Sequence, residues 1–171
     1  GTNQPAPSLA GAHWARGGPF TNFIPGQLYV VEFHSSSNGA APGGAPVLAT
    51  LAQKYAGRHT FISVSLAAPG VDEAKRKADL AAFVRAQGPR LNYALGMDTA
   101  DGRLAQAWLV AAGQTNLPVA FVVDKSGKVA WIGNPARGLD EALNASGAMA
   151  LPGRLTERPP SPELELRRRV S

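Results

Sequence analysis

The residues of this chain best suited to chemistry lie in a short polar stretch that follows an apolar run. Residues 28–33 are rich in β-branched and aromatic side chains and predict a buried central strand. His34 follows this run directly, and histidine and serine together can form a nucleophilic pair. Adjacent residues that leave a strand point to opposite sides, so His34 cannot readily activate Ser35. Activation of Ser36 is sterically easier, but no acid is obviously placed to orient the imidazole.

One acid, Glu32, interrupts the apolar run, and we expect it to be buried. No Lys or Arg lies nearby in the sequence, and the loop that follows offers hydroxyls, an amide and small side chains. An unpaired buried carboxylate is costly. We therefore expect a neutral group or water, rather than a cation, to satisfy the carboxyl of Glu32.

The composition excludes several classes of site. The 171 residues include no cysteine, which rules out disulfides, zinc–thiolate sites, iron–sulfur clusters and a cysteine nucleophile. The three histidines (His13, His34 and His59) are scattered, so no metal-ligand spacing occurs and no metal or other cofactor is expected. The net charge of +5 comes from interspersed charges of both signs, with the aromatic residues in apolar runs, which does not favour a nucleic-acid surface. No run approaches the roughly 20 apolar residues that membrane insertion requires.

Strand and helix patterns alternate along the chain. In order, they predict a strand at 28–33, a loop at 35–44, a helix from Pro46 to Gly57, a strand at 60–66, a helix at about 72–87, a strand at 91–95, a helix capped by Asp101 and running to about 111, a hairpin of 119–123 with 128–132, and a helix at 138–145. This order predicts an α/β domain over residues 28–147, with a central mixed sheet flanked by helices and a closing C-terminal β-hairpin and helix. Residues 1–27 predict an irregular N-terminal arm that packs on this domain, and residues 148–171 a flexible tail rich in Pro and Arg.

Two segments carry a family resemblance. The run Val30-Val31-Glu32-Phe33, followed by a loop and a helix that begins at Pro46, resembles the V-V-x-F-W-A-T-W-C-G-P-C-R-x-x-x-P segment of TlpA-type thioredoxin-like proteins. Residues 107–133 resemble the G-x-P-T-x-F-x-x-D-x-x-G-K-x-x-x-x-G block of the same family. The proline of that block, here Pro118 after Leu117, carries a cis peptide bond that faces the redox site. The resemblance covers roughly residues 5–145 and implies a thioredoxin-like fold.

The resemblance also implies which residues occupy the former redox site. Aligned without a gap, the two cysteines of the family fall on Asn38 and Ala41, with Gly39 and Ala40 between them. The first thiol of such a site attacks a disulfide and the second resolves the mixed disulfide. Neither an amide nor a methyl group performs these steps, so both half-reactions of a thiol–disulfide oxidoreductase are lost. Glu32 falls where such proteins often place a buried acid that relays a proton to a thiol.

The resemblance leaves four hypotheses for function. The first is a redox-inactive module that binds a peptide, protein or small ligand through the former active-site face, along a cis-proline groove formed by His34, Ser36, Asn38, Leu117 and Pro118. The second is an enzyme of another class that uses His34, Ser36 and Asn38. The third is a structural domain of a larger assembly. The fourth is an oxidoreductase whose cysteines were removed by engineering, although natural divergence explains more simply why the tryptophan, cysteine and proline positions all differ. The resemblance further suggests a bacterial protein that is periplasmic or secreted.

Overall fold

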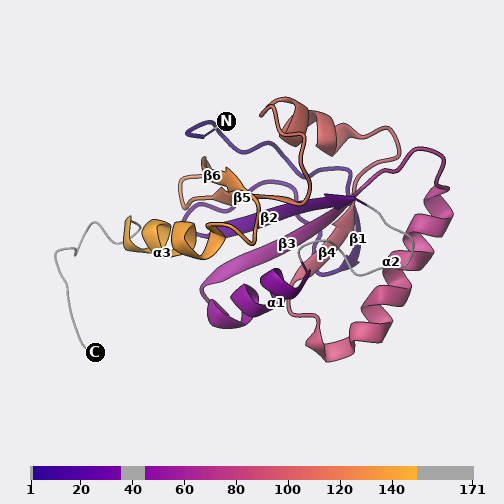
Figure 1. The fold of residues 1–171 in the computed structure, drawn as a ribbon, viewed down its shortest axis with the longest axis horizontal. Helices are drawn as coiled ribbons and strands as arrows, with labels where there is room; N and C mark the ends of the chain where they lie inside the picture. Colours follow the sequence, from indigo (N-terminus) through magenta and orange to yellow (C-terminus); the bar gives the residue numbers. More distant parts are fainter. Residues whose placement is uncertain (1, 36–44, 150–171) are drawn as a thin grey trace. The chain divides into compact units, whose positions relative to one another are not determined.

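The computed structural model describes residues 2–35 and 45–149. The chain divides into two compact units, residues 1–140 and 141–171, and the first contains the sheet. The elements in chain order are β1 (His13–Arg16), β2 (Leu28–Ser35), α1 (Ala45–Lys54), β3 (His59–Leu66), α2 (Glu73–Gln87), the short 3₁₀ helix η1 (Gly88–Arg90), β4 (Ala94–Met97), the π-helical segment η2 (Ala105–Val110), β5 (Val119–Val123), β6 (Val129–Gly133) and α3 (Leu139–Met149) (Figure 1).

The sheet has the predicted mixed character. Its strand order is β1-β4-β3-β2-β5-β6. Strands β2, β3 and β4 are mutually parallel, β5 pairs antiparallel with β2, and β6 closes the predicted hairpin against β5. The expectation of an α/β fold with a central mixed sheet and a C-terminal hairpin and helix is therefore confirmed.

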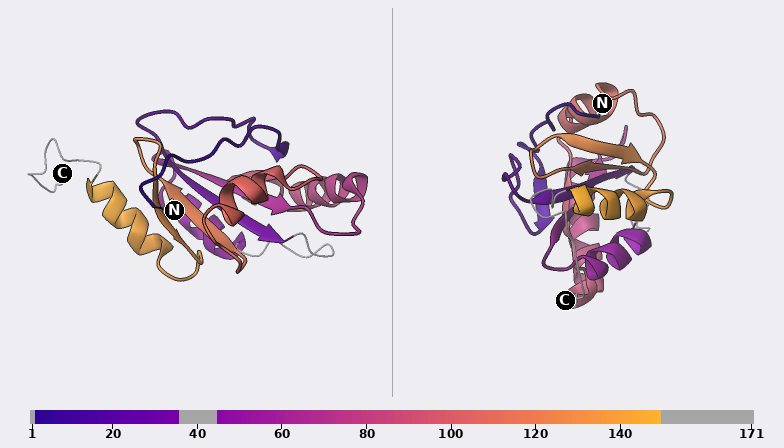
Figure 2. Two further views of the ribbon diagram at one scale, coloured as in Figure 1. Left: turned by 90° about the horizontal axis from the view of Figure 1, so that it is seen from above. Right: turned by 90° about the vertical axis from the view of Figure 1, so that its left-hand side faces the viewer.

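Strand β2 is buried on both faces, which explains why its sequence is apolar at successive positions rather than at alternate ones. Tyr29, Val31 and Phe33 lie on one face and belong to a core that includes Trp108 of η2. The ring of Trp108 lies 5.5 Å from that of Phe33 and 5.1 Å from that of Phe121, measured between centroids. Helix α1 lies on the side of the sheet opposite η2 (Figures 1 and 2). Glu32 alternates with Val31 and Phe33 and therefore faces away from the Trp108 core.

Several element boundaries differ from the sequence expectation. The N-terminal arm contributes β1, which pairs antiparallel with β4 at one edge of the sheet. Strand β2 continues through His34 and Ser35, because both residues pair with β3. Strand β4 begins at Ala94 rather than Leu91, because its pairing with β3 starts at Ala94. Helix α3 extends to Met149, so it includes the first residues of the predicted tail, and residues 150–171 lie outside the described part of the chain.

The carboxylate that caps the helix before β5 is Asp98 rather than the predicted Asp101. Asp98 is 2% exposed, and its carboxylate accepts hydrogen bonds from the backbone N–H groups of Leu104 (2.8 Å) and Ala105 (3.0 Å). Asp101 instead accepts the hydroxyl hydrogen of Thr99 at 2.6 Å. The turn between the two acids brings the carboxylate of Asp98 to the first N–H groups of the helix. The spacing of residues along the sequence does not predict this contact.

Within the described ranges, no helix combines the length and the apolar character that a bilayer-spanning segment needs.

The histidine that begins β3 makes the stability of the fold dependent on pH. The ring of His59 stacks on Tyr55 with centroids 5.0 Å apart, and its Nε2 is buried without a hydrogen-bond partner in the described structure. Burial, reinforced by the charges of Arg58 and Lys125, lowers the pKa of His59 below its usual value of 6.5. The unfolded chain then binds more protons between the two pKa values. The stability that neutral His59 contributes is therefore complete above the unfolded pKa and is lost as pH falls through the folded one.

We predict that His59→Phe reduces this loss of stability in acid. The phenyl ring keeps the stacking on Tyr55 and cannot be protonated. Urea titrations of the two proteins at about pH 7.5 and about pH 5 should show a smaller fall in unfolding free energy for the variant. If the unfolding free energy falls equally for the two proteins, protonation of His59 is not the cause of the loss of stability in acid.

Candidate functional site

A cluster of three buried polar side chains lies near the carboxyl end of β2, which we call the polar cluster: Glu32, His34 and Ser63. Their residues are 0%, 3% and 0% exposed, respectively. Glu32 and His34 are two residues apart on β2 and therefore share a face of the sheet. Ser63 joins them because the parallel register of β2 with β3 places it opposite Glu32. The cluster therefore depends on one strand pairing.

The hydrogen bonds of the polar cluster converge on a single carboxylate oxygen. The hydroxyl of Ser63 donates to Oε1 of Glu32 at 2.6 Å. Nδ1 of His34 lies 3.2 Å from the same oxygen and 3.1 Å from Oγ of Ser63. Buried carboxylates are costly unless such donors satisfy them. Ser63 and His34 thus account for the tolerance of an acid in an apolar strand.

These contacts determine which nitrogen of His34 carries hydrogen. Ser63 uses its only hydrogen in the bond to Glu32, so Oγ presents lone pairs to the imidazole. Oε1 of Glu32 also presents lone pairs, so both neighbours of Nδ1 are acceptors. Nδ1 must therefore carry hydrogen, which leaves Nε2 as the nitrogen able to take up a proton.

The structure corrects the sequence interpretation that no acid orients the imidazole of His34. Glu32 holds that position, and the signal available in the sequence was the spacing of two residues along a strand. Ser63 was missed altogether, because only the register of β2 with β3 brings it to the site. Glu32 is contacted by the neutral hydroxyl of Ser63 and by the imidazole of His34.

The polar cluster does not have the geometry of a serine-hydrolase triad. In such a triad the carboxylate and the serine contact different nitrogens of the imidazole. Here Glu32 and Ser63 both lie beside Nδ1 of His34, and the Ser63 hydroxyl donates to the carboxylate instead of to the ring. Ser63 is also fully buried. It positions its neighbours and cannot itself attack a substrate.

Tyr93, which precedes β4, lies within electrostatic range of the polar cluster. It is 7% exposed, and burial raises the pKa of its phenol to about 12, with the negative charge of Glu32 acting in the same direction. Tyr93 consequently keeps its hydroxyl hydrogen throughout the physiological range.

The remaining predicted site residues divide into two groups. Ser36, Asn38, Gly39, Ala40 and Ala41 lie outside the described residues. Leu117 and Pro118 lie just before β5, and the peptide bond between them is cis, as is that between Gly18 and Pro19.

The ladder between β2 and β5 brings the second group towards the polar cluster. The ladder is antiparallel and pairs Phe33 with Val119, so His34, which follows Phe33, and Pro118, which precedes Val119, lie at the same end of it. The side chain of Leu117 is 40% exposed. Within the described structure, the backbone N–H and C=O groups of Asn116 and Leu117 take part in no hydrogen bond. Across the described ranges, no group of three or more His, Asp or Glu residues is arranged to hold a metal ion.

We predict that the hydrogen bond from Ser63 stabilises the fold. Ser63→Ala removes the closest donor to a buried carboxylate and should lower the unfolding free energy by about 1–3 kcal/mol in urea titrations. Ser65→Ala is the matched control, because Ser65 is 3% exposed, lies two residues further along β3 and makes no side-chain hydrogen bond within the described residues. If the two variants lose equal unfolding free energy, the hydrogen bond from Ser63 to Glu32 does not contribute to stability.

Comparison with known proteins identifies the family. No protein-family model matches the chain. Protein FixW of Rhizobium leguminosarum is 31% identical over 159 residues, which cover 88% of this chain and 72% of FixW. That likeness is sufficient to place the two proteins in one family.

Two solved structures share the fold. A thiol:disulfide interchange protein of the thioredoxin family from Chlorobium tepidum superposes with a TM-score of 0.60 at 24% identity, covering 84% of this chain and 95% of its own. The pneumococcal exposed lipoprotein thioredoxin of Streptococcus pneumoniae gives 0.52 at 16% identity, covering 71% and 87%. The chain has a thioredoxin-like fold with a mixed six-stranded sheet, contains no cysteine, and belongs to the same family as FixW.

Proposed function

We propose that this protein is a redox-inactive binding module that holds an extended peptide segment along the backbone just before β5. The observation that carries the proposal is the state of Asn116 and Leu117. Their backbone groups are unpaired within the described structure, and the side chain of Leu117 is 40% exposed. An extended peptide would pair with those groups and cover that side chain.

The chemistry of the chain supports binding rather than thiol exchange. Thiol–disulfide exchange requires a thiolate as the attacking group, and the sequence contains no cysteine. Pairing through backbone hydrogen bonds needs no thiol. The former active-site face can therefore still bind an extended peptide.

The peptide partner would meet both polar and apolar groups. Leu117 offers an apolar contact, and His34, at the same end of the β2–β5 ladder as Pro118, offers an imidazole whose Nδ1 is engaged with Glu32. Ser36 and Asn38, which follow His34 in sequence, would supply further hydrogen bonds. We also propose a periplasmic or extracellular location, which the exposed lipoprotein among the structural relatives supports.

A second candidate is an enzyme of another class. The observation that favours it is the contact of Glu32 with Nδ1 of His34 at 3.2 Å, which leaves Nε2 able to accept a proton as a general base does. Ser36 and Asn38 would then contact the substrate. His34 is only 3% exposed, so the substrate would have to reach it at the end of β2.

We predict that a charge at position 117 weakens peptide binding. The probe is β-casein, an unfolded polypeptide, titrated into the isotope-labelled protein and followed by backbone amide NMR. Binding should shift the amides of Asn116, Leu117 and Val119, and Leu117→Asp should weaken it about tenfold or more, because a carboxylate replaces the apolar contact. Ile24→Asp is the matched control, since Ile24 is 67% exposed and belongs to the N-terminal arm.

Equal losses for the two variants, or amide shifts that avoid the segment before β5, would refute this binding site. β-Casein recovered intact after the titration supports a binding module. Cleavage that His34→Gln abolishes would establish the enzyme instead.

A further inference from the structure

A pocket of about 430 Å³ opens where β1 ends and where β3 and β4 begin. Its walls are the end of β1 and the turn after it, the last turn of α1, the beginning of β3 and the segment that leads into β4. The polar cluster and Leu117 belong instead to the end where β2 finishes. The pocket is therefore separate from the peptide site proposed above. Its volume falls within the range of about 300–1,000 Å³ that small-molecule sites occupy.

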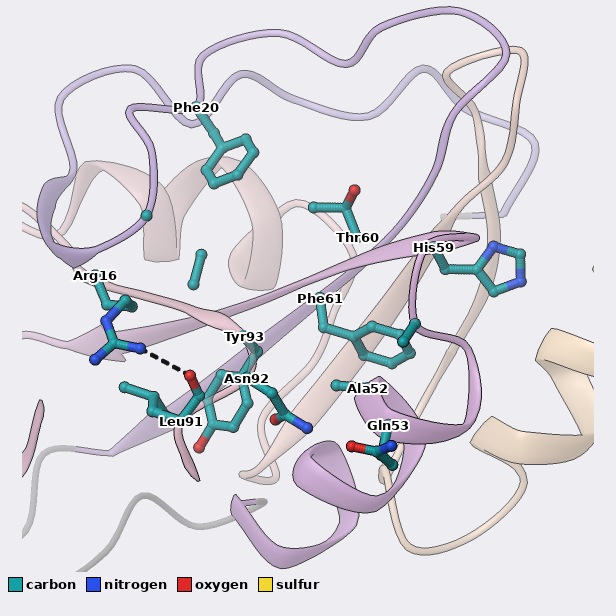
Figure 3. Close-up of a pocket in the computed structure, with 14 residues that line it drawn as sticks. Arg16, Phe20, Ala52, Gln53, His59, Thr60, Phe61, Leu91, Asn92 and Tyr93 are labelled. Carbon is teal, nitrogen blue, oxygen red and sulfur yellow. Dashed lines mark hydrogen bonds between the residues drawn. The ribbon is translucent and has the colours of Figure 1, made fainter. Parts of the chain in front are cut away.

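The walls of the pocket combine aromatic surface with one fixed cation. Figure 3 shows Phe20 on one side and Phe61, Leu91 and Tyr93 on the other, with Arg16 at one end. His59 lies at the opposite end with its ring directed away from the cavity (Figure 3). None of the described residues that line the pocket carries a carboxylate, and the negative charge of Glu32 acts on the wall only through its effect on Tyr93.

Backbone carbonyl groups hold the side chain of Arg16 in place, and no carboxylate among the described residues pairs with its charge. Its guanidinium donates to the backbone oxygens of Leu91 at 2.8 Å and Gly88 at 3.2 Å. Neither acceptor carries a charge, and none of the ion pairs in the described part of the chain involves Arg16. A guanidinium has five N–H donors, so donors remain for a ligand. A positioned guanidinium with spare donors suits a carboxylate or phosphate.

The carboxyl end of α1 also reaches the pocket, and free carbonyl groups there would favour a cation. Two of these carbonyls are occupied, because Leu51 O accepts from the N–H of Tyr55 and Gln53 O accepts from that of Ala56. Among the described residues that line the pocket, Arg16 carries the full positive charge that a ligand would meet.

We infer that this pocket binds a small organic anion with an aromatic or apolar body. The anionic group contacts Arg16, and the body packs against Phe61 and Leu91 on the pocket wall. Asn92 on the pocket wall donates its amide to Ala49 O at 3.1 Å, which leaves its side-chain oxygen able to accept a hydrogen bond from the ligand.

Three probes of matched shape and different charge test the inference: benzoate, benzyl alcohol and benzylamine. Each is titrated into the full chain and followed by amide NMR. Benzoate should give saturable shifts at residues that line the pocket and should bind about tenfold or more tightly than the other two. Saturable binding of benzylamine with equal strength, or no saturable shift at the lining residues, would overturn the proposal.

Two variants localise the binding. Arg16→Gln should weaken benzoate about tenfold, whereas Arg137→Gln, the same change at an exposed arginine outside the pocket, should leave it unaltered. Arg16 also holds two backbone carbonyls, so its variant could lose stability. Ala56→Phe provides a second test, because it fills the pocket from an exposed position in the turn after α1 and removes no side-chain hydrogen bond. Benzoate binding that survives Ala56→Phe in a folded protein would disprove the site.

Discussion

The parallel register of β2 on β3 is the constraint on which the site depends. It places Ser63 opposite Glu32 and so supplies a buried carboxylate with a hydroxyl donor at 2.6 Å. The pleat of β2 then puts His34 on the same face, two residues further along the strand. A shift of one residue in this register would move Ser63 away and leave the acid without its closest donor. The strand pairing and the polar cluster therefore stabilise each other.

The polar cluster includes the acid to which the family resemblance gives a role in redox chemistry. The family resemblance places a proton-relaying acid at Glu32, beneath a thiol. Here no thiol is present, and the carboxylate is engaged by Ser63 and His34. A satisfied polar group in the interior favours one arrangement of its neighbours, because any rearrangement would leave a buried donor or acceptor unpaired. Such a cluster holds the end of β2 in place beside the backbone of Leu117 and Pro118, which we propose as the peptide site.

Local sequence patterns predicted the elements that have strong local signals. The apolar run before His34 and the hairpin between β5 and β6 both follow from side-chain type and turn residues. Features that arise from long-range pairing were not predictable in this way. The pairing of β1 with β4, the role of Asp98 as a cap and the meeting of Ser63 with Glu32 each join residues whose proximity depends on the folded chain. The pocket beside Arg16 likewise draws its walls from four separate segments.

The hydrogen position on His34 tests this account of the site most directly. If Glu32 and Ser63 both present lone pairs to the ring, Nδ1 must carry hydrogen. Long-range ¹H–¹⁵N correlation spectra of the histidine rings, assigned through His34→Gln, report which nitrogen is protonated. The account predicts a protonated Nδ1 for His34 near neutral pH. A ring protonated only at Nε2 would contradict it, because Nδ1 would then accept a hydrogen bond and the carboxylate could not be its neighbour in the arrangement described.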